Sequence, residues 1–158
     1  MIIRIAFIWE GDILVIKPYE ERYRDDLIFM VLQAKDALGR VPSINEDLLH
    51  IQESYFDQGD FFWVAVDDND RVIGSIGYSR IADTTEAFLH RLYVKASEKH
   101  KGIGSALLNT AETAMREAGL TVSHVHMGSP RSQWFESWSF YPKHGYREYR
   151  PGYMKKNL

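Results

Sequence analysis

The sequence predicts an α/β protein of the mixed α+β kind, with helices on the faces of a central sheet. Two hairpin patterns fill the first half, and a strand, a helix and another strand follow in the order of a parallel crossover. At 158 residues and 45% hydrophobic, the chain can bury a sizeable core. No linker or repeat divides it. We therefore expect a single domain over residues 1–158, in which residues 1–12 add an N-terminal strand.

The first strands form a predicted hairpin. Apolar side chains alternate from Ile3 to Trp9, and Gly11-Asp12 separates them from a second run, Ile13 to Lys17. A connection of this kind favours antiparallel pairing. The apolar face of the first strand would either seal the core or form the contact between two copies in a homodimer.

Two helices are predicted next. Apolar residues recur at helical spacing from Tyr19 and stop near Gly39. Ser43 and Glu46 have the spacing of a capping box, which predicts a second helix ending near Gly59. The acidic residues here are either a solvated face or an attraction for a cationic substrate; they are Glu46, Asp47, Glu53 and Asp57.

The second half alternates strands and helices. Polar residues 67–71 separate two strand patterns, and small and apolar residues share one face of a helix after Gly104 that ends at Gly119. The Pro151-Gly152 pair predicts a terminal strand that is bent or broken. The predicted ranges are strands 61–66, 72–81, 89–94, 121–127 and 146–154, and a last helix 129–141.

The loop between the strand and the helix is suited to a phosphate. Gly102 and Gly104 let a ligand approach the backbone, and the helix that follows directs N–H groups and its positive dipole end at an anion. Lys99, His100 and Lys101 add positive or chargeable side chains at the rim.

Two common phosphate motifs are excluded by spacing. A dinucleotide fingerprint needs a third glycine where Leu107 stands, and an acidic residue on the next strand, where residues 121–127 have none. The Walker motif needs a Gly-Lys-Ser/Thr sequence, which does not occur in the chain. The loop therefore binds a phosphate of another kind.

The strand end Leu92-Tyr93-Val94 followed by Lys99-x-x-Gly102-x-Gly104 resembles the GCN5-related N-acetyltransferase (GNAT) family, with Lys99 where the family has Arg or Gln. The resemblance implies the GNAT fold, with about six to seven strands and four helices, and acetyl-CoA as co-substrate without a metal. It implies that Leu92, Tyr93 and Val94 offer backbone groups to the pantetheine. The pyrophosphate would be held by Lys99, His100, Lys101, Gly102, Ile103, Gly104 and Ser105, and Lys143 is a candidate for a coenzyme phosphate.

Tyr141 carries the second resemblance. The sequence from Tyr141 to Tyr146 is similar to the family's Tyr-x-x-x-Gly-Phe/Tyr pattern, in which the tyrosine often protonates the departing thiolate. A phenol is protonated at neutral pH, so it can donate to a forming thiolate. The alternative is ordinary core packing. Pro142 predicts that the helix ends or kinks at Tyr141, and Trp134 stands where the family commonly has Asn.

A general base is needed because an ammonium group has no lone pair with which to attack a thioester. Phe88 occupies the position of the family's strand carboxylate. Strand alternation predicts that His90 shares a face with Leu92 and Val94, and that Glu86 lies on the same face, where it could act itself or orient the imidazole. The alternatives are a structural histidine, a solvated glutamate and a water chain as the base.

His90, His124 and His126 also invite comparison with a three-histidine zinc site, but strand histidines more often pack or face solvent, so we expect no metal. The absence of cysteine excludes disulfides and a covalent cysteine mechanism. A net charge of −3 gives no global basic field for nucleic acid, and the N-terminus fits neither a membrane span nor a cleaved leader. We expect a cytoplasmic protein with neither nucleic-acid nor membrane partners.

The sequence thus predicts an acyltransferase that moves an acetyl group from acetyl-CoA directly to a primary amine of a small molecule or peptide, in a ternary complex. Tyr141 would be the acid, and His90 or Glu86 the base. Two alternatives stay open: a coenzyme-binding module or ligand sensor without catalysis, and an acetyltransferase that modifies proteins.

Overall fold

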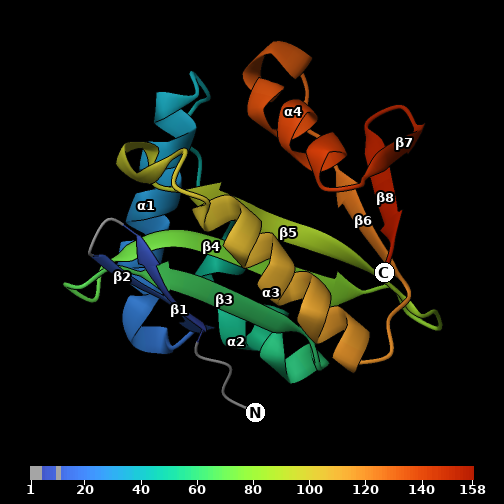
Figure 1. Cartoon of the computed structure of the whole chain (residues 1–158), viewed down its shortest axis with the longest axis horizontal. Coiled ribbons are helices and arrows are strands. Elements are labelled where there is room, and N and C mark those ends of the chain that lie inside the picture. Colours follow the sequence, from blue (N-terminus) through green and yellow to red (C-terminus); the bar gives the residue numbers. More distant parts are fainter. Residues whose placement is uncertain (1–4, 10–11) are drawn as a thin grey trace.

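The computed structural model describes residues 5–9 and 12–158, which form a mixed eight-stranded sheet with helices on both faces (Figure 1). The strand order is β1-β2-β3-β4-β5-β6-β8-β7, and all neighbours are antiparallel except β5 and β6. The strands are β1 (Ile5–Trp9), β2 (Asp12–Pro18), β3 (Phe61–Val66), β4 (Val72–Arg80), β5 (Glu86–Val94), β6 (Val122–His126), β7 (Arg147–Arg150) and β8 (Tyr153–Asn157).

The two ends of the sheet are hairpins. Trp9 pairs with Asp12, so the predicted antiparallel pairing of the first two strands is confirmed, although Gly11 lies outside the described residues. At the other end, the predicted terminal strand is broken at Pro151-Gly152 into β7 and β8, which pair with each other. Gly152 has a positive φ of 81°, a conformation that glycine adopts without a steric penalty.

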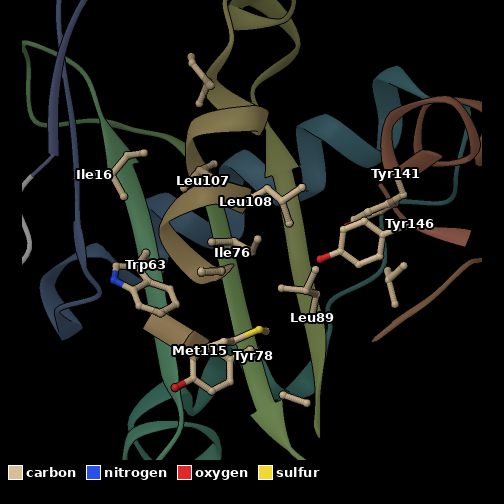
Figure 2. Packing of buried hydrophobic residues seen from close by; sticks show 14 of the residues in the cluster. Ile16, Trp63, Ile76, Tyr78, Leu89, Leu107, Leu108, Met115, Tyr141 and Tyr146 are labelled. Atoms are coloured by element: carbon tan, nitrogen blue, oxygen red, sulfur yellow. The ribbon is translucent and has the colours of Figure 1, made fainter. Parts of the chain in front are cut away.

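The helices bury one apolar layer on each face of the sheet. On one face, α1 (Arg24–Ala37) and the short α2 (Ile51–Ser54) contribute Leu27, Met30 and Ile51 to a core that includes Phe62 of β3. On the other, α3 (Ile103–Glu117) crosses the front of the sheet in Figure 1, and α4 (Phe135–Lys143) packs with it. Figure 2 shows this second core, from Trp63 and Tyr78 at one side to Tyr141 and Tyr146 at the other.

The predicted second helix is wrong as one continuous element. It is divided into η2 (Glu46–Leu49), α2 and η3 (Phe56–Gln58), and Asn45 rather than Ser43 stands at the N-cap, so the capping box does not form. Tertiary contacts explain the break, because short turns let Leu48, Ile51 and Tyr55 all reach the core. The predicted last helix, 129–141, is likewise divided, into a short turn at Arg131–Gln133 and α4. No helix in residues 5–9 and 12–158 has the length and apolar character to cross a membrane.

The sheet opens between β5 and β6. These parallel strands pair only from Glu86–Val122 to Phe88–His124, while β6 continues along β8 and β5 continues along β4. Beyond Phe88, residues 89–94 of β5 therefore have no described strand on their β6 side. This separation creates the space in which the predicted site residues lie.

Candidate functional site

A cleft of about 980 Å³ fills the opening between β5 and β6. Its walls come from the second half of β5, the loop before α3, the end of β6 and the inner side of α4. The structure brings most of the predicted site residues into this lining: His90, Leu92, Tyr93, Val94, Lys99, His100, Gly102, Ile103, Gly104, Ser105, Tyr141 and Lys143. Glu86 and Lys101 lie outside it.

The free edge of β5 is the first chemical feature of the cleft. Tyr93 and Val94 pair with β4 on one side, Leu92 lies next to them where the register shifts, and all three border the cleft on the other side. A strand edge without a neighbour presents N–H and C=O groups that must find partners. An extended ligand with amide groups would pair with this edge as an additional strand does.

The loop before α3 is shaped by two residues in the left-handed region. His100 has a φ of 64° and Gly102, the N-cap of α3, has a φ of 81°. These turns bring the chain into a helix of 15 residues whose first N–H groups have no intrahelical acceptor. The N-terminus of α3 thus directs unpaired donors and a positive dipole end toward the cleft.

Gly104 is not required by the fold. A Cβ atom placed there would lie 3.5 Å from the Phe140 ring and 3.7 Å from Val94, which are ordinary contacts. Its φ is not positive, unlike that of Gly102. The missing side chain leaves room in the lining of the cleft, as a site for a close-fitting anion needs.

Two lysines of the loop are held by glutamates. The Lys99 ammonium makes a short contact with the Glu136 carboxylate of α4, a pair that joins the loop to α4 across the cleft. Lys101 pairs with Glu98 at 2.8 Å and lies outside the lining. Lys99 therefore lies in the lining of the cleft, whereas Lys101 pairs within its own loop.

Tyr141, on α4, is part of the lining of the cleft. Its ring packs against Tyr146 with centroids 5.3 Å apart, and the residue is 5% exposed (Figure 2). Burial raises the pKa of its phenol above the ordinary value, so the hydroxyl is protonated throughout the neutral range. The α4 helix runs through Pro142 to Lys143, so the predicted helix end at Tyr141 is wrong.

A β-bulge changes the face on which His90 lies. Gly77 pairs with His90 and Ser75 pairs with Tyr93, so Arg91 and Leu92 together oppose Ile76, and Arg91 has a φ of 56°. The prediction that His90 shares a face with Leu92 and Val94 is therefore wrong. The extra residue places the His90 ring near Tyr55, with centroids 6.2 Å apart, whereas Leu92 and Val94 pack against the α3 core.

His90 is a histidine kept neutral. Its Nε2 lies 2.7 Å from the Ser79 hydroxyl. Burial and then the positive charge of Arg91 lower the pKa of His90 below its usual value. An imidazole that is unprotonated at neutral pH can accept a proton, so the position and state of His90 are compatible with a general base.

Glu86 is not the partner of His90. Its carboxylate lies 3.2 Å from Nε2 of His124, and the other ring nitrogen of His124 lies 3.0 Å from the Tyr149 hydroxyl. The prediction that Glu86 orients the His90 imidazole is therefore wrong. His126 instead stacks on Tyr153, and the described residues contain no group of three or more side chains suited to a metal ion.

Several cleft residues were not predicted as site residues. Arg40, which follows α1, stacks on Trp134 at 3.5 Å, and the Trp134 indole lies directly on Gly128. Arg91 makes a bidentate pair with Asp47. These partners are 44 to 94 residues apart in sequence, so no local pattern could indicate them.

The four acidic residues that we considered as an attraction for a cationic substrate lie outside the cleft lining. Asp47 is occupied by Arg91 and by the Tyr55 hydroxyl, which lies 2.6 Å from it. Burial acts to raise the pKa of Asp47, but the hydrogen bonds from Arg91 and Tyr55 hold this pKa below its usual value. Glu46, Glu53 and Asp57 are exposed, as expected for a solvated face.

Comparison with known proteins covers most of the chain. The family model described as "Acetyltransferase (GNAT) family" matches residues 27–146. No protein of curated function is similar to the chain at a significant level.

Solved structures share the whole architecture. An acetyltransferase of the GNAT family from Staphylococcus aureus Mu50 superimposes with a TM-score of 0.82 at 22% identity, over 92% of this chain and 99% of that one. An acetyltransferase from Streptococcus agalactiae 2603 gives 0.81 at 19% identity, over 95% and 100%. The PaiA N-acetyltransferase from Thermoplasma acidophilum, in complex with coenzyme A, gives 0.72 at 25% identity, over 92% and 99%.

Proposed function

Because the chain belongs to the acetyltransferase (GNAT) family, we propose that it transfers an acetyl group from acetyl-CoA directly to a primary amine. The observation that carries this proposal is the cleft itself. One opening contains the free edge of β5, the N-terminus of α3, a neutral imidazole and a protonated phenol. The related PaiA enzyme holds coenzyme A, which supports the same ligand class for this chain.

The coenzyme would be held mainly by backbone groups. Residues 92–94 offer the strand edge to the amide groups of the pantetheine, and the first turn of α3 offers N–H groups to the pyrophosphate. Gly104 leaves the space for the phosphates, and Lys99 adds a positive charge. Lys143, which lines the cleft on α4, is placed for a further phosphate of the coenzyme.

The chemical step removes two protons from the acceptor nitrogen and delivers one to the leaving sulfur. His90 accepts a proton from the attacking ammonium, either directly or through water, so that the amine nitrogen can form a bond to the thioester carbon. Tyr141 donates to the sulfur as the carbon–sulfur bond breaks, which leaves a neutral thiol, and the second proton lost by the nitrogen returns through water to the Tyr141 oxygen. His90 then releases the first proton to solvent. No cysteine is present to form an acetyl-enzyme through sulfur, and the proposed transfer is direct, with both substrates bound.

Release of free thiol from acetyl-CoA across a panel of amines tests this function. We expect release with at least one primary amine and none without an acceptor. A protein that binds acetyl-CoA yet releases no thiol with any amine or peptide would instead be a sensor, an alternative favoured by Phe88 at the position of the family's strand carboxylate. Release with peptides alone would indicate a protein acetyltransferase.

A further inference from the structure

The acceptor side of the cleft carries excess positive charge. Three cations lie close together on the α1 and α2 side of β5: Lys35 near the end of α1, Arg40 after it, and Arg91 at the β5 bulge. Two carboxylates act on this group: Asp47, which Arg91 occupies with a bidentate pair, and Glu136, which attracts Arg40 but is paired with Lys99. The positive charges of the group therefore exceed the negative charges available to it.

Lys35 shows that this group is desolvated. Its side chain is buried, and its ammonium donates to the Ser43 carbonyl at 2.6 Å and to the Asn45 amide oxygen at 2.7 Å, both neutral acceptors. Burial, followed by the nearby charges of Arg91 and Arg40, lowers the pKa of Lys35. The electrostatic field at this end of the cleft is thus unfavourable to another cation.

Arg40 is the cation that an incoming ligand can reach. It is half-buried in the lining of the cleft, and its Nε donates to the Gln133 carbonyl at 3.0 Å while its plane stacks on Trp134. No carboxylate in the described part of the chain forms an ion pair with it. The Tyr93 phenol also interacts with the guanidinium. Because a guanidinium has five N–H donors, these partners leave others for an anion.

The acids that line the cleft cannot serve a cationic acceptor. Glu98 and Glu136 are the two carboxylates of the lining, and each is paired with a lysine of the phosphate loop. Among the described lining residues, no acidic side chain is left without a cationic partner. A polyamine would find neither an anchor nor a favourable potential here.

We propose that Arg40, with Arg91 beside it, binds the carboxylate of the acceptor, which makes the acceptor an α-amino acid or a close relative with an apolar side chain. This inference rests on the proposed function and narrows it to a substrate class. The acceptor carboxylate would lie against Arg40, and its amino group would face His90, next to Arg91 in the chain. Phe88 and Trp134 line the same cleft and suit an apolar side chain.

Matched acceptors test the proposal. L-methionine, L-leucine and L-phenylalanine are compared with their primary amides, which keep the amine and lose the carboxylate. Turnover is followed by thiol release, and binding is followed by calorimetry on protein saturated with coenzyme A. We expect at least one of the three acids to bind and react about tenfold or more better than its amide, as expected for a charge-assisted hydrogen bond.

Variants of Arg40 test whether this residue causes the preference for the acid over the amide. Arg40→Gln should remove the preference for the acid, Arg40→Lys should keep part of it, and neither should change the KM for acetyl-CoA. Arg131→Gln is the control, because Arg131 stacks on Trp138 at 4.4 Å in the same manner but lies outside the cleft. It should behave as wild type.

Three results would overturn the proposal. In the first, amides or simple amines react as well as the acids do, and in the second, the acids neither bind nor react. The third is an Arg40→Gln variant whose affinity for acetyl-CoA falls while its affinity for the acid is unchanged. The last result would assign the anion site to a coenzyme phosphate. Binding of the acid without turnover would support the anion site and contradict the transferase function. Failure of coenzyme A to bind would likewise count against the proposed function rather than the anion site, which calorimetry on the unliganded protein would then test with the same acids and amides.

Discussion

Tyr141 is proposed as the acid because its side chain is buried and its hydroxyl makes no hydrogen bond to another described residue. Tyr141→Phe removes only that oxygen, so we expect kcat to fall by roughly 10²-fold, as for loss of a general acid, while the affinity for acetyl-CoA changes little. Steady-state kinetics and calorimetry measure the two effects. An unchanged kcat would remove Tyr141 from the mechanism.

Tyr146 provides the matched control for that substitution. It is the neighbouring buried tyrosine, but its hydroxyl lies 2.9 Å from Glu112 and 2.8 Å from Ser123. Tyr146→Phe removes these hydrogen bonds, although Glu112 keeps its ion pair with Lys156, and we expect the substitution to lower the free energy of unfolding by about 1–3 kcal/mol. Urea denaturation should show this loss for Tyr146→Phe and little loss for Tyr141→Phe.

His90 predicts a pH dependence of stability. Its pKa is lowered in the folded protein, so the unfolded chain binds more protons as the pH falls below about 6.5, the ordinary pKa of histidine. As the pH falls below that value, His90 therefore lowers the free energy of unfolding. This loss continues until the pH reaches the lower pKa that His90 has in the folded protein. We expect the urea midpoint to fall between pH 7 and pH 5, and to fall less in His90→Asn. An equal fall in both proteins would contradict a depressed pKa at His90.

Individual residues of the site were predictable where a local motif names them. Gly102, Gly104 and Tyr141 follow from short patterns, and the structure places all three at the cleft. Glu86 was misassigned because alternation along a strand says nothing about the neighbouring strand, which supplies His124 as its partner. Arg40 was missed because its contacts come from Gln133 and Trp134, just before α4 and far along the chain.

At the scale of elements, the turn from β5 into α3 makes a prediction of its own. A Gly104→Trp side chain would extend from the first turn of α3 into the cleft, so we expect it to abolish acetyl-CoA binding while the protein stays folded. Gly104→Ala is the control, because its Cβ makes only ordinary contacts with Phe140 and Val94. Calorimetry should detect binding to the alanine variant only. Normal affinity in the tryptophan variant would refute the pyrophosphate site.

Strand β5 shows why elements were easier to predict than their details. Its apolar character identified the strand and its end at Val94, but the strand begins at Glu86, three residues before the predicted start. The bulge at Arg91 depends on the pairing with β4, and it inverts the faces on which the residues before and after it lie. The division of the predicted second helix has the same origin, since the core decides where its turns end.

At the scale of the whole molecule, the sheet with helices on both faces was predictable from the order of the elements and from the GNAT resemblance. The position of the opening was not, because it arises where β5 and β6 stop pairing after Phe88. That separation brings together the phosphate loop from one core and the cation group from the other. The function proposed for the chain depends on both sides meeting there.

Coenzyme binding should also stabilise the molecule as a whole. A ligand that binds only the folded state raises its stability by about 2.7 kcal/mol at a concentration 100 times Kd. We therefore expect the thermal midpoint to rise with acetyl-CoA concentration, and Gly104→Trp to show no such rise. A midpoint that is insensitive to acetyl-CoA in the wild-type protein would contradict the binding site.

The position of the coenzyme in a crystal structure of the complex with acetyl-CoA tests the proposed function most directly. We expect the pantetheine to pair with residues 92–94, and the thioester sulfur to lie within hydrogen-bonding distance of the Tyr141 hydroxyl. The measured distance between the sulfur and the Tyr141 hydroxyl oxygen shows whether Tyr141 can protonate the thiolate. A coenzyme bound outside the opening between β5 and β6, or a sulfur directed away from Tyr141, would contradict the proposed function.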